Sequence, residues 1–464
     1  MVSFEEKFAL IAEKMRKENL PEIAIKNFEF YYRTLLEGHT GFISESEIQP
    51  VKSLPDLESL SEDFRKVGEA HLKKTVIIKL NGGLGTSMGL NKAKSLLLVK
   101  DNYCFLDIIA RQAILSKVPL VLMNSFSTRK NSLKVLEKYP ELKGNIPLDF
   151  VQHKVPKIAQ SDLSPISWPQ NPQLEWCPPG HGDLYVAMVT SGILDTLLDH
   201  GYEYAFVSNS DNLGAVLSTA ILGYFVKNRL PFLMEVADRT EADKKGGHLA
   251  QLPNGQFILR EIAQCPPEDL GAFQDIRKYK YFNTNSLWIH LRRLKEVMAK
   301  KDNILGLPMI RNEKTVDPRD PSSPKVYQLE TAMGAAISVF EGAGAIRVPR
   351  QRFAPVKNTN DLLAVRSDCY ILTEQFQIIP NSERTLPPIF IQLDSSFFKK
   401  IDDFEERFPF GPPSLKECQQ LIVEGDFKFG KDLILRGKVH LINKSEKQIF
   451  IQDGTVIEGT QNYT

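Results

Sequence analysis

The chain has 464 residues, which is enough for two or three domains and a large apolar core. Its formal net charge is +1, and this balance argues against bulk binding of nucleic acid. Five cysteines without a C-x-x-C pair indicate neither a zinc site nor a disulfide framework, and no apolar run approaches membrane-spanning length. Because the N-terminus has no signal-peptide pattern, we expect a cytoplasmic enzyme that binds neither nucleic acid nor a membrane.

Residues 1–70 are expected to form a helical N-terminal segment. Ser3 and Glu6 match a capping box, and Phe8 belongs to an apolar stripe at helical spacing. Pro21 restarts the helical pattern. Nothing in this segment indicates chemistry, so we interpret it as an appendage of the main domain.

A glycine-rich stretch follows the first strand-like run, Thr75 to Ile78. Four glycines occur within eight positions of this stretch, and Lys94 follows them. Glycine lets the main chain approach a ligand closely, and exposed backbone N–H groups together with a lysine attract phosphates. The spacing matches neither the Walker A pattern nor the dinucleotide fingerprint. A tight turn without a ligand is the plainer alternative, but such a turn needs only one or two glycines.

Between residues 71 and 392, short apolar runs alternate with helix-like stretches. This alternation predicts an α/β fold, a doubly wound domain with a mostly parallel sheet. Ligands of such sheets bind beyond the carboxyl ends of the strands. The expected strands lie at 118–123, 148–151, 204–207 and 232–236, and the expected helices include 183–198 and 216–227.

Polar clusters follow these strands. Asp211 comes soon after the strand expected at 204–207 and is well placed to hold Mg²⁺, which takes one or two carboxylates together with phosphates and waters. The alternative is that Asp211 caps the following helix. Each of the other clusters could by itself be a turn, a set of buried hydrogen-bonding residues or a solvated basic face. They lie at 178–183, 245–248, 261–264, 282–285, 329–331 and 350–357.

The C-terminal segment, residues 393–464, has a different pattern. After a Pro/Gly-rich link come short β-like runs separated by glycines or Asp-Gly pairs. This pattern is consistent with a small β-solenoid-like domain. The runs lie at 427–430, 433–435, 439–442 and 449–451.

Taken in chain order, the motifs resemble those of the eukaryotic-type UTP–glucose-1-phosphate uridylyltransferases. The glycine-rich stretch reads L-N-G-G-L-G-T-x-M-G, and a proline-glycine loop reads P-P-G-H-G-D. The similarity spans roughly residues 75–370 and includes N-S-D-N-L-G at 209–214, K-G-G at 245–247, E-I-A-Q at 261–264, F-N-T-N at 282–285, L-E-T-A at 329–332 and R-F-A-P-V-K at 352–357.

The resemblance implies a nucleotidyltransferase that uses Mg²⁺ and converts UTP and a sugar 1-phosphate into UDP-sugar and pyrophosphate. The family's roles, carried over to this sequence, make Lys94 and Lys357 the catalytic cations and Asp211 the metal ligand. The implied nucleotide contacts are Leu80, Asn81, Gly82, Gly83, Lys94, Met123, Gln152, Gly180, Asn209, Ser210, Asp211 and Lys357. The implied sugar-phosphate contacts are Gly82, Gly83, His181, Gly246, Glu261, Asn283 and Glu330.

Three other functions remain open from the sequence. The first is a UDP-sugar or UDP-N-acetylhexosamine pyrophosphorylase of different or broader sugar specificity. The second is a GT-A-like glycosyltransferase, although Ser210-Asp211-Asn212 lacks the second carboxylate of an Asp-x-Asp metal motif. The third is a non-catalytic nucleotide sensor.

The chain departs from the family pattern in two places. Ala93 stands where the family has a proline before the catalytic lysine, so the loop is expected to be less rigid. Larger relatives carry a further β-coil, beyond the position that corresponds to Thr464, and this coil supports octamers. We therefore expect a monomer or a small homo-oligomer.

Overall fold

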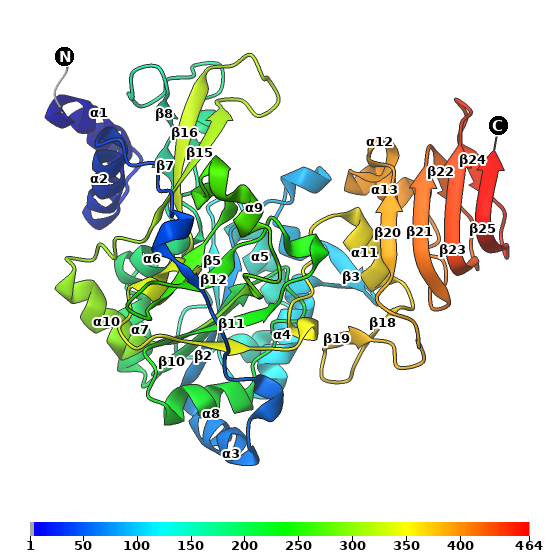
Figure 1. Ribbon diagram of the computed structural model, residues 1–464, viewed down its shortest axis with the longest axis horizontal. Coiled ribbons are helices and arrows are strands. Elements are labelled where there is room, and N and C mark those ends of the chain that lie inside the picture. The colour runs from blue at the N-terminus through cyan, green and yellow to red at the C-terminus, as the bar shows by residue number, and fades with distance from the viewer. Residues whose placement is uncertain (1–3, 464) are drawn as a thin grey trace.

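The computed structural model describes residues 4–463 and contains three regions (Figure 1). A central α/β body lies between the N-terminal helices on one side and the C-terminal strands on the other. Ser3, half of the expected capping box, lies outside the described residues. Within residues 4–463, no helix combines the length and the apolar character that a membrane span requires.

The N-terminal segment is helical, as predicted, with α1 (Phe4–Lys17) and α2 (Glu22–Leu36) packed against each other. Their apolar faces join residues of β7 (Val155–Pro156) and β9 (Trp176–Cys177) in one cluster. That cluster also contains Met309 and Leu329, which lie on two paired antiparallel strands. The small sheet beside α1 and α2 consists of β8 (Ile158–Ala159), β15 (Met309–Thr315) and β16 (Lys325–Thr331).

The third N-terminal helix, α3 (Glu62–His71), packs closely on α8 (Thr219–Lys227) at the base of the central body. The crossing is built on two glycines. A Cβ added at Gly68 would collide with the carbonyl oxygen of Thr219, and one at Gly223 would collide with the carbonyl oxygen of Phe64. Only glycine lets the two backbones approach this closely.

Strand β2 (Thr75–Asn81) lies inside the central sheet and has parallel neighbours on both sides. It pairs with β10 (Tyr204–Asn209) on one side and with β5 (Leu120–Asn124) on the other. Leu80 lies opposite Asn209, so the carboxyl ends of β2 and β10 meet at the same edge of the sheet. The α/β fold and the parallel strands predicted from the sequence are confirmed.

Strand β14 (Tyr281–His290) extends the sheet beyond β10 in the antiparallel direction. Its register against β11 (Phe232–Asp238) shifts between Glu235 and Val236, which marks a bulge. Asn285 in this bulge has a φ of 55°, a conformation that is uncommon outside glycine and that re-aims side chains. The remaining strands of the sheet are β1 (Gln49–Pro50), β6 (Asp149–Val151), β12 (His248–Gln251), β13 (Phe257–Arg260) and β17 (Gly344–Arg347).

Helices cover both faces of the sheet, as a doubly wound sheet requires. Val76 and Ile78 of β2 share one apolar cluster with the helices that begin at Leu184, Ile193 and Leu291. Ile77 shares another cluster with the helices that begin at Phe105 and Thr219. The single helix expected at 183–198 is two helices, because Gly192 breaks it with a φ of 74°. The helices besides α8 are α4 (Phe105–Ser116), α5 (Arg129–Leu136), α6 (Leu184–Thr190), α7 (Ile193–Asp199), α9 (Leu270–Phe273) and α10 (Leu291–Lys300).

The C-terminal strands between Phe390 and Tyr463 pair in the parallel direction and form a stack to one side of the central body (Figure 1). The two runs expected at 433–435 and 439–442 belong to one strand, which passes through Gly437 at a φ of 62°. The elements of this region are α11 (Thr359–Arg366), β18 (Tyr370–Leu372), β19 (Ile378–Pro380), β20 (Phe390–Leu393), α12 (Ser395–Phe398), α13 (Ile401–Arg407), β21 (Cys418–Glu424), β22 (Phe427–Phe429), β23 (Ile434–Asn443), β24 (Ile449–Ile451) and β25 (Val456–Tyr463).

The core of the C-terminal region continues into the glycine-rich stretch. Met88 and Leu90 belong to the same apolar cluster as the C-terminal strands, and a Cβ at Gly89 would lie 3.3 Å from the side chain of Lys400. A short hairpin precedes α4 and shares this cluster. It consists of β3 (Leu98–Lys100) and β4 (Tyr103–Cys104).

Lys79 is a basic residue enclosed within the sheet. Its side-chain nitrogen donates to the hydroxyl of Ser208, at 2.7 Å, and to the carbonyl oxygen of Ala215, at 2.8 Å. The pKa of Lys79 is lowered to about 7, chiefly by burial; the charge of Arg352 adds to the decrease, and that of Glu235 opposes it. A charged Lys79 therefore destabilises the fold below about pH 7, and this cost disappears as the pH rises.

We predict that Lys79→Met weakens the pH dependence of stability. Between about pH 7 and the pKa of an unfolded lysine, the unfolded wild-type chain binds a proton that the folded chain lacks, so its stability rises by up to about 1.4 kcal/mol per pH unit. The variant loses this contribution. Urea midpoints of both proteins at about pH 7 and about pH 8.5 measure it, with Lys92→Met as an exposed-lysine control. An equal change in urea midpoint between the two pH values for wild type and Lys79→Met would contradict the prediction.

Candidate active site

The glycine-rich loop returns to its own start. Leu84 and Ala93 form a β-bridge, and the backbone N–H of Lys94 donates to the carbonyl oxygen of Gly83, at 3.2 Å. Lys94 is therefore held beside the first glycines of the loop. Ala93 has a φ of −52°, close to the value that a proline ring imposes, so the loop keeps this path without the family's proline.

An ion pair joins this loop to the end of β10. The ammonium of Lys94 lies 2.7 Å from Oδ2 of Asp211, and the two side chains are 17% and 24% exposed. The carbonyl oxygen of Asp211 accepts from the backbone N–H of Val356, at 3.2 Å, which places Lys357 next to the pair. The structure thus brings together both predicted catalytic lysines and the predicted metal ligand.

Asn212 ties the same two segments together through its side chain. Its amide nitrogen donates to the carbonyl oxygen of Arg352, at 3.2 Å, and its oxygen accepts from the backbone N–H of Ala354, at 3.0 Å. Lys357 itself is exposed, with its ammonium 5.6 Å from the ring of Phe353. Its charge is therefore available to a ligand at the surface of the site.

Asp361 is a charged residue of this site that the sequence analysis did not identify. Its Oδ2 accepts from the backbone N–H groups of Lys357, at 2.7 Å, and Asn358, at 3.1 Å. The pKa of Asp361 is raised, because burial outweighs the opposing effects of these two bonds and of the charges of Lys357 and Lys94. The signal that could have found it is the capping box formed by Asn358 and Asp361 at the start of α11.

A cavity of about 410 Å³ opens beside the start of the loop. The Gln152 side chain lies directly over Gly82, since a Cβ at Gly82 would be 2.7 Å from Oε1 of Gln152. The amide of Gln152 carries both a donor and an acceptor, as recognition of a uracil edge requires. The cavity is lined by Gly82, Gly83, Leu84, Thr86, Ser125, Phe126, Ser127, Gln152, His153, Lys154, Gln173, Trp176, Cys177 and Pro178.

Two predicted nucleotide contacts have buried side chains. The amide nitrogen of Asn81 donates to Asn124, at 2.7 Å, and to Ser132, at 2.8 Å, and Met123 belongs to the apolar core. The side chains of Asn81 and Met123 therefore support the sheet, in which Met123 pairs with Leu80 on one side and with Phe150 on the other.

Other predicted nucleotide contacts lie at the joined ends of β2 and β10. The backbone N–H of Ser210 donates to the carbonyl oxygen of Leu80, at 3.1 Å, and Asn209 pairs with Leu80 across the strands. Leu80, Asn209, Ser210 and Asp211 thus share one edge of the sheet. This edge lies next to the glycine-rich loop, as the sequence predicts.

The 178–183 loop packs on β16. Gly180 has a φ of 77°, and a Cβ at this position would collide with the carbonyl oxygen of Thr331. The Nδ1 atom of His181 accepts from the backbone N–H of Met333, at 2.9 Å, so the ring hydrogen lies on Nε2. Burial lowers the pKa of His181 to about 4, which makes it a neutral hydrogen-bond donor at physiological pH.

The predicted sugar contacts form two groups. The backbone N–H of Asn283 donates to the carbonyl oxygen of Gly247, at 3.1 Å, and a Cβ at Gly247 would lie 2.5 Å from the Glu261 carboxyl. Gly246 packs under the Phe282 ring in the same group. Burial raises the pKa of Glu261 to about 7.

Glu330 belongs to the second group, with Gly180 and His181. A Cβ at Gly180 would lie 3.1 Å from the Cβ of Glu330. Burial raises the pKa of Glu330, and a hydrogen bond with Asn312 and the charge of Lys314 oppose the change.

The described residues could hold a magnesium ion through a single carboxylate, that of Asp211. Among residues 4–463, no cluster of three or more histidine, cysteine or acidic side chains could hold a metal ion. Asp211 supplies a single, partly exposed carboxylate next to the glycine-rich loop. This donor set suits an ion whose other ligands are phosphate oxygens and waters.

Comparisons with known proteins match nearly the whole chain. The family described as UTP--glucose-1-phosphate uridylyltransferase matches residues 25–436. The protein of that name from Solanum tuberosum is 42% identical over 436 residues, which are 91% of this chain and 89% of the relative. The one from Encephalitozoon cuniculi is 38% identical over 438 residues, 93% of this chain and 85% of the relative.

Solved structures agree with this assignment. A crystal structure of a UDP-glucose pyrophosphorylase mutant from Leishmania major in complex with UDP-Glc superposes with a TM-score of 0.92 at 44% identity, covering 99% of this chain and 100% of that chain. A UDP-glucose phosphorylase from Trypanosoma brucei gives a TM-score of 0.89 at 45% identity, with the same coverage. The chain belongs to the UTP–glucose-1-phosphate uridylyltransferase family.

Proposed function

We propose that this chain transfers the uridylyl group of UTP to glucose 1-phosphate and releases pyrophosphate, giving UDP-glucose. The observation that carries the proposal is the meeting of Lys94, Asp211 and Lys357 beside the glycine-rich loop. The adjoining cavity presents the Gln152 amide over Gly82, which suits a pyrimidine edge. Family membership supports the same reaction.

The proposed chemistry is an in-line displacement without a covalent enzyme intermediate. The sugar-phosphate oxygen attacks the α-phosphorus of UTP, and pyrophosphate leaves from the opposite side. Lys94 and Lys357 stabilise the charge that develops on the phosphate oxygens. His181, neutral with its hydrogen on Nε2, donates to the sugar phosphate without adding charge.

Magnesium is part of this proposal. Asp211 would hold the ion together with nucleotide phosphates, and the bound ion would neutralise charge on those phosphates. In the structure, Asp211 pairs with Lys94. Lys94 would leave this carboxylate for the nucleotide phosphates when Asp211 holds the ion.

We also propose the finer organisation of the chain. The catalytic domain comprises residues 71–392, preceded by the helical segment 1–70. Residues 393–464 form the β-solenoid-like domain, and the parallel pairing of its strands supports this assignment. We propose a cytoplasmic protein that is a monomer or a small homo-oligomer.

The reaction is tested by pyrophosphate release from UTP and Mg²⁺ with glucose 1-phosphate or N-acetylglucosamine 1-phosphate as the acceptor. We expect release with glucose 1-phosphate and little with the acetylated sugar. Preference for the acetylated sugar would move the specificity to the N-acetylhexosamine class. Absence of release with both sugars would overturn the proposed reaction.

We predict that Lys94→Ala lowers kcat by about a hundredfold to a thousandfold, the usual cost of losing one charge-stabilising group. Affinity for UTP should fall less than kcat, because Gln152 and the loop backbone remain. Steady-state kinetics and equilibrium UTP binding measure the two effects. Lys92→Ala, an exposed lysine of the same loop, is the matched control. Equal losses in kcat and UTP affinity would indicate a purely binding role.

We predict that Asp211→Asn raises the Mg²⁺ concentration needed for half-maximal rate by at least about tenfold, because an amide is a weaker ligand for this ion than a carboxylate. Pyrophosphate release across a Mg²⁺ titration measures the shift. Asp402→Asn, at the exposed start of α13, controls for loss of a surface charge. A Mg²⁺ curve identical to that of the wild type would remove Asp211 as the ligand.

A further inference from the structure

A buried ion pair joins the segment after β6 to the 178–183 loop. Asp183 accepts from the backbone N–H of His153, at 2.7 Å, and its carboxylate oxygens lie 2.9 and 3.0 Å from Nδ1 of the same histidine. The two side chains are 8% and 3% exposed for His153 and Asp183. One carboxylate therefore holds both the main chain and the ring of a single residue.

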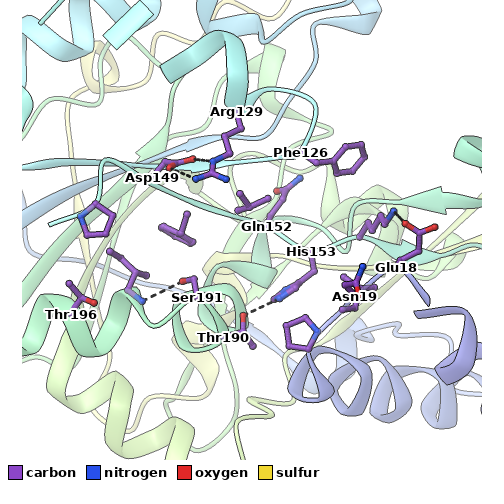
Figure 2. Close-up of a pocket in the computed structure, with 17 residues that line it drawn as sticks. Glu18, Asn19, Phe126, Arg129, Asp149, Gln152, His153, Thr190, Ser191 and Thr196 are labelled. Carbon is purple, nitrogen blue, oxygen red and sulfur yellow. Dashed lines mark hydrogen bonds and ion pairs between the residues drawn. The ribbon is translucent and has the colours of Figure 1, made fainter. Parts of the chain in front are cut away.

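The histidine ring is satisfied at both nitrogens. Its Nε2 lies 3.0 Å from the hydroxyl of Thr190 (Figure 2). Burial lowers the pKa of His153, but the charge and the hydrogen bond of Asp183 outweigh it, so the pKa lies above its ordinary value. A buried pair of this kind contributes little more to the free energy of unfolding than apolar packing would. The role of the His153–Asp183 pair is therefore sought in what its geometry positions.

The pair supports a wall, residues 152–154, that borders two cavities. Gln152, the residue before His153, lines the 410 Å³ cavity of the candidate active site. It also lines a second cavity, of about 640 Å³, together with His153 and Thr190. Figure 2 shows that the Gln152 and His153 side chains leave the chain in different directions.

Few contacts hold the main chain of this wall. The backbone N–H of Gln152 donates to the carbonyl oxygen of Asn124, at 2.8 Å, and that of His153 donates to Asp183. Because Gln152 borders both cavities, these bonds help to fix its position where packing is incomplete.

The other end of the pair is anchored beside His181. Asp183 stands two residues after His181, at the start of α6, and Gly180 and Gly182 pack against Thr331 of β16. The carboxylate thus joins the rigid loop that carries His181 to the wall that carries Gln152.

We propose that Asp183 and His153 are positioning residues for uracil recognition. The pair keeps the Gln152 amide over Gly82 and at a set distance from His181, so that base and sugar phosphate are bound in one register. This inference rests on the proposed function. Its specific consequence is base selectivity, because uracil and cytosine present opposite hydrogen-bond groups at N3 and at C4 and a fixed amide distinguishes them.

We predict that Asp183→Asn weakens UTP binding by at least about tenfold, the scale of one lost hydrogen bond to a charged group, and leaves CTP binding nearly unchanged. The ratio of UTP to CTP affinity then falls by a similar factor. His153→Ala should have the same effect. His153→Asn should keep most of the selectivity, because its amide nitrogen can replace Nδ1 as the donor to Asp183.

Calorimetric titration of the full chain with UTP and with CTP, alongside thermal unfolding, tests this. Asp107→Asn is the matched control, since Asp107 is buried outside the site and accepts from the backbone N–H of Cys104, at 3.0 Å, and the hydroxyl of Tyr139, at 2.8 Å. We expect it to lower thermal stability without changing the UTP to CTP ratio.

The outcomes separate the inference from the proposed function. A wild-type chain that does not bind UTP would overturn the proposed function. A wild type that prefers UTP, with an Asp183→Asn variant that keeps this preference, would overturn the inference alone. If Asp183→Asn fails to fold, His153→Ala and His153→Asn decide the question, and equal selectivity in these two would also overturn it.

Discussion

The position of β2 between two parallel neighbours is the constraint on which the rest of the structure depends. Hydrogen bonding to β5 and β10 on both sides leaves β2 no freedom to shift, and helices cover both of its faces. The glycine-rich loop therefore starts from a fixed point. The Lys94–Asp211 pair forms because β2 and β10 end together, and the loop's far side rests on the C-terminal core at Met88.

Burial, rather than the net charge of the whole chain, determines the charge state of several groups around the pocket. The Lys94–Asp211 ion pair lies beside the glycine-rich loop, close to the exposed Lys357. His181 is neutral because it is buried, and Glu261 has a pKa of about 7 for the same reason. The polar residues around the pocket thus contribute hydrogen bonds, while the two lysines contribute charge.

Much of the fold, and the meeting of the glycine-rich loop with Asp211 and Lys357, could be predicted from the sequence, because apolar runs and glycine spacing reflect local structure. The features that could not be predicted depend on where a side chain points and on contacts between residues far apart in the sequence. A motif does not record that the Asn81 side chain turns into the sheet, nor that Asp183 reaches His153 thirty positions earlier. The sequence pattern predicts a strand boundary at Gly437, yet β23 continues through this residue because it pairs with parallel strands on both sides.

The N-terminal helices are completed by segments made much later. Met15 and Tyr32 share one apolar cluster with Met309 and Leu329. At about 5–20 residues per second, roughly 15–60 s of synthesis separate the first helices from these partners. During that time the apolar faces of α1 and α2 are covered only in part, by residues of β7 and β9, so the growing chain exposes apolar surface that favours aggregation until β15 and β16 are made.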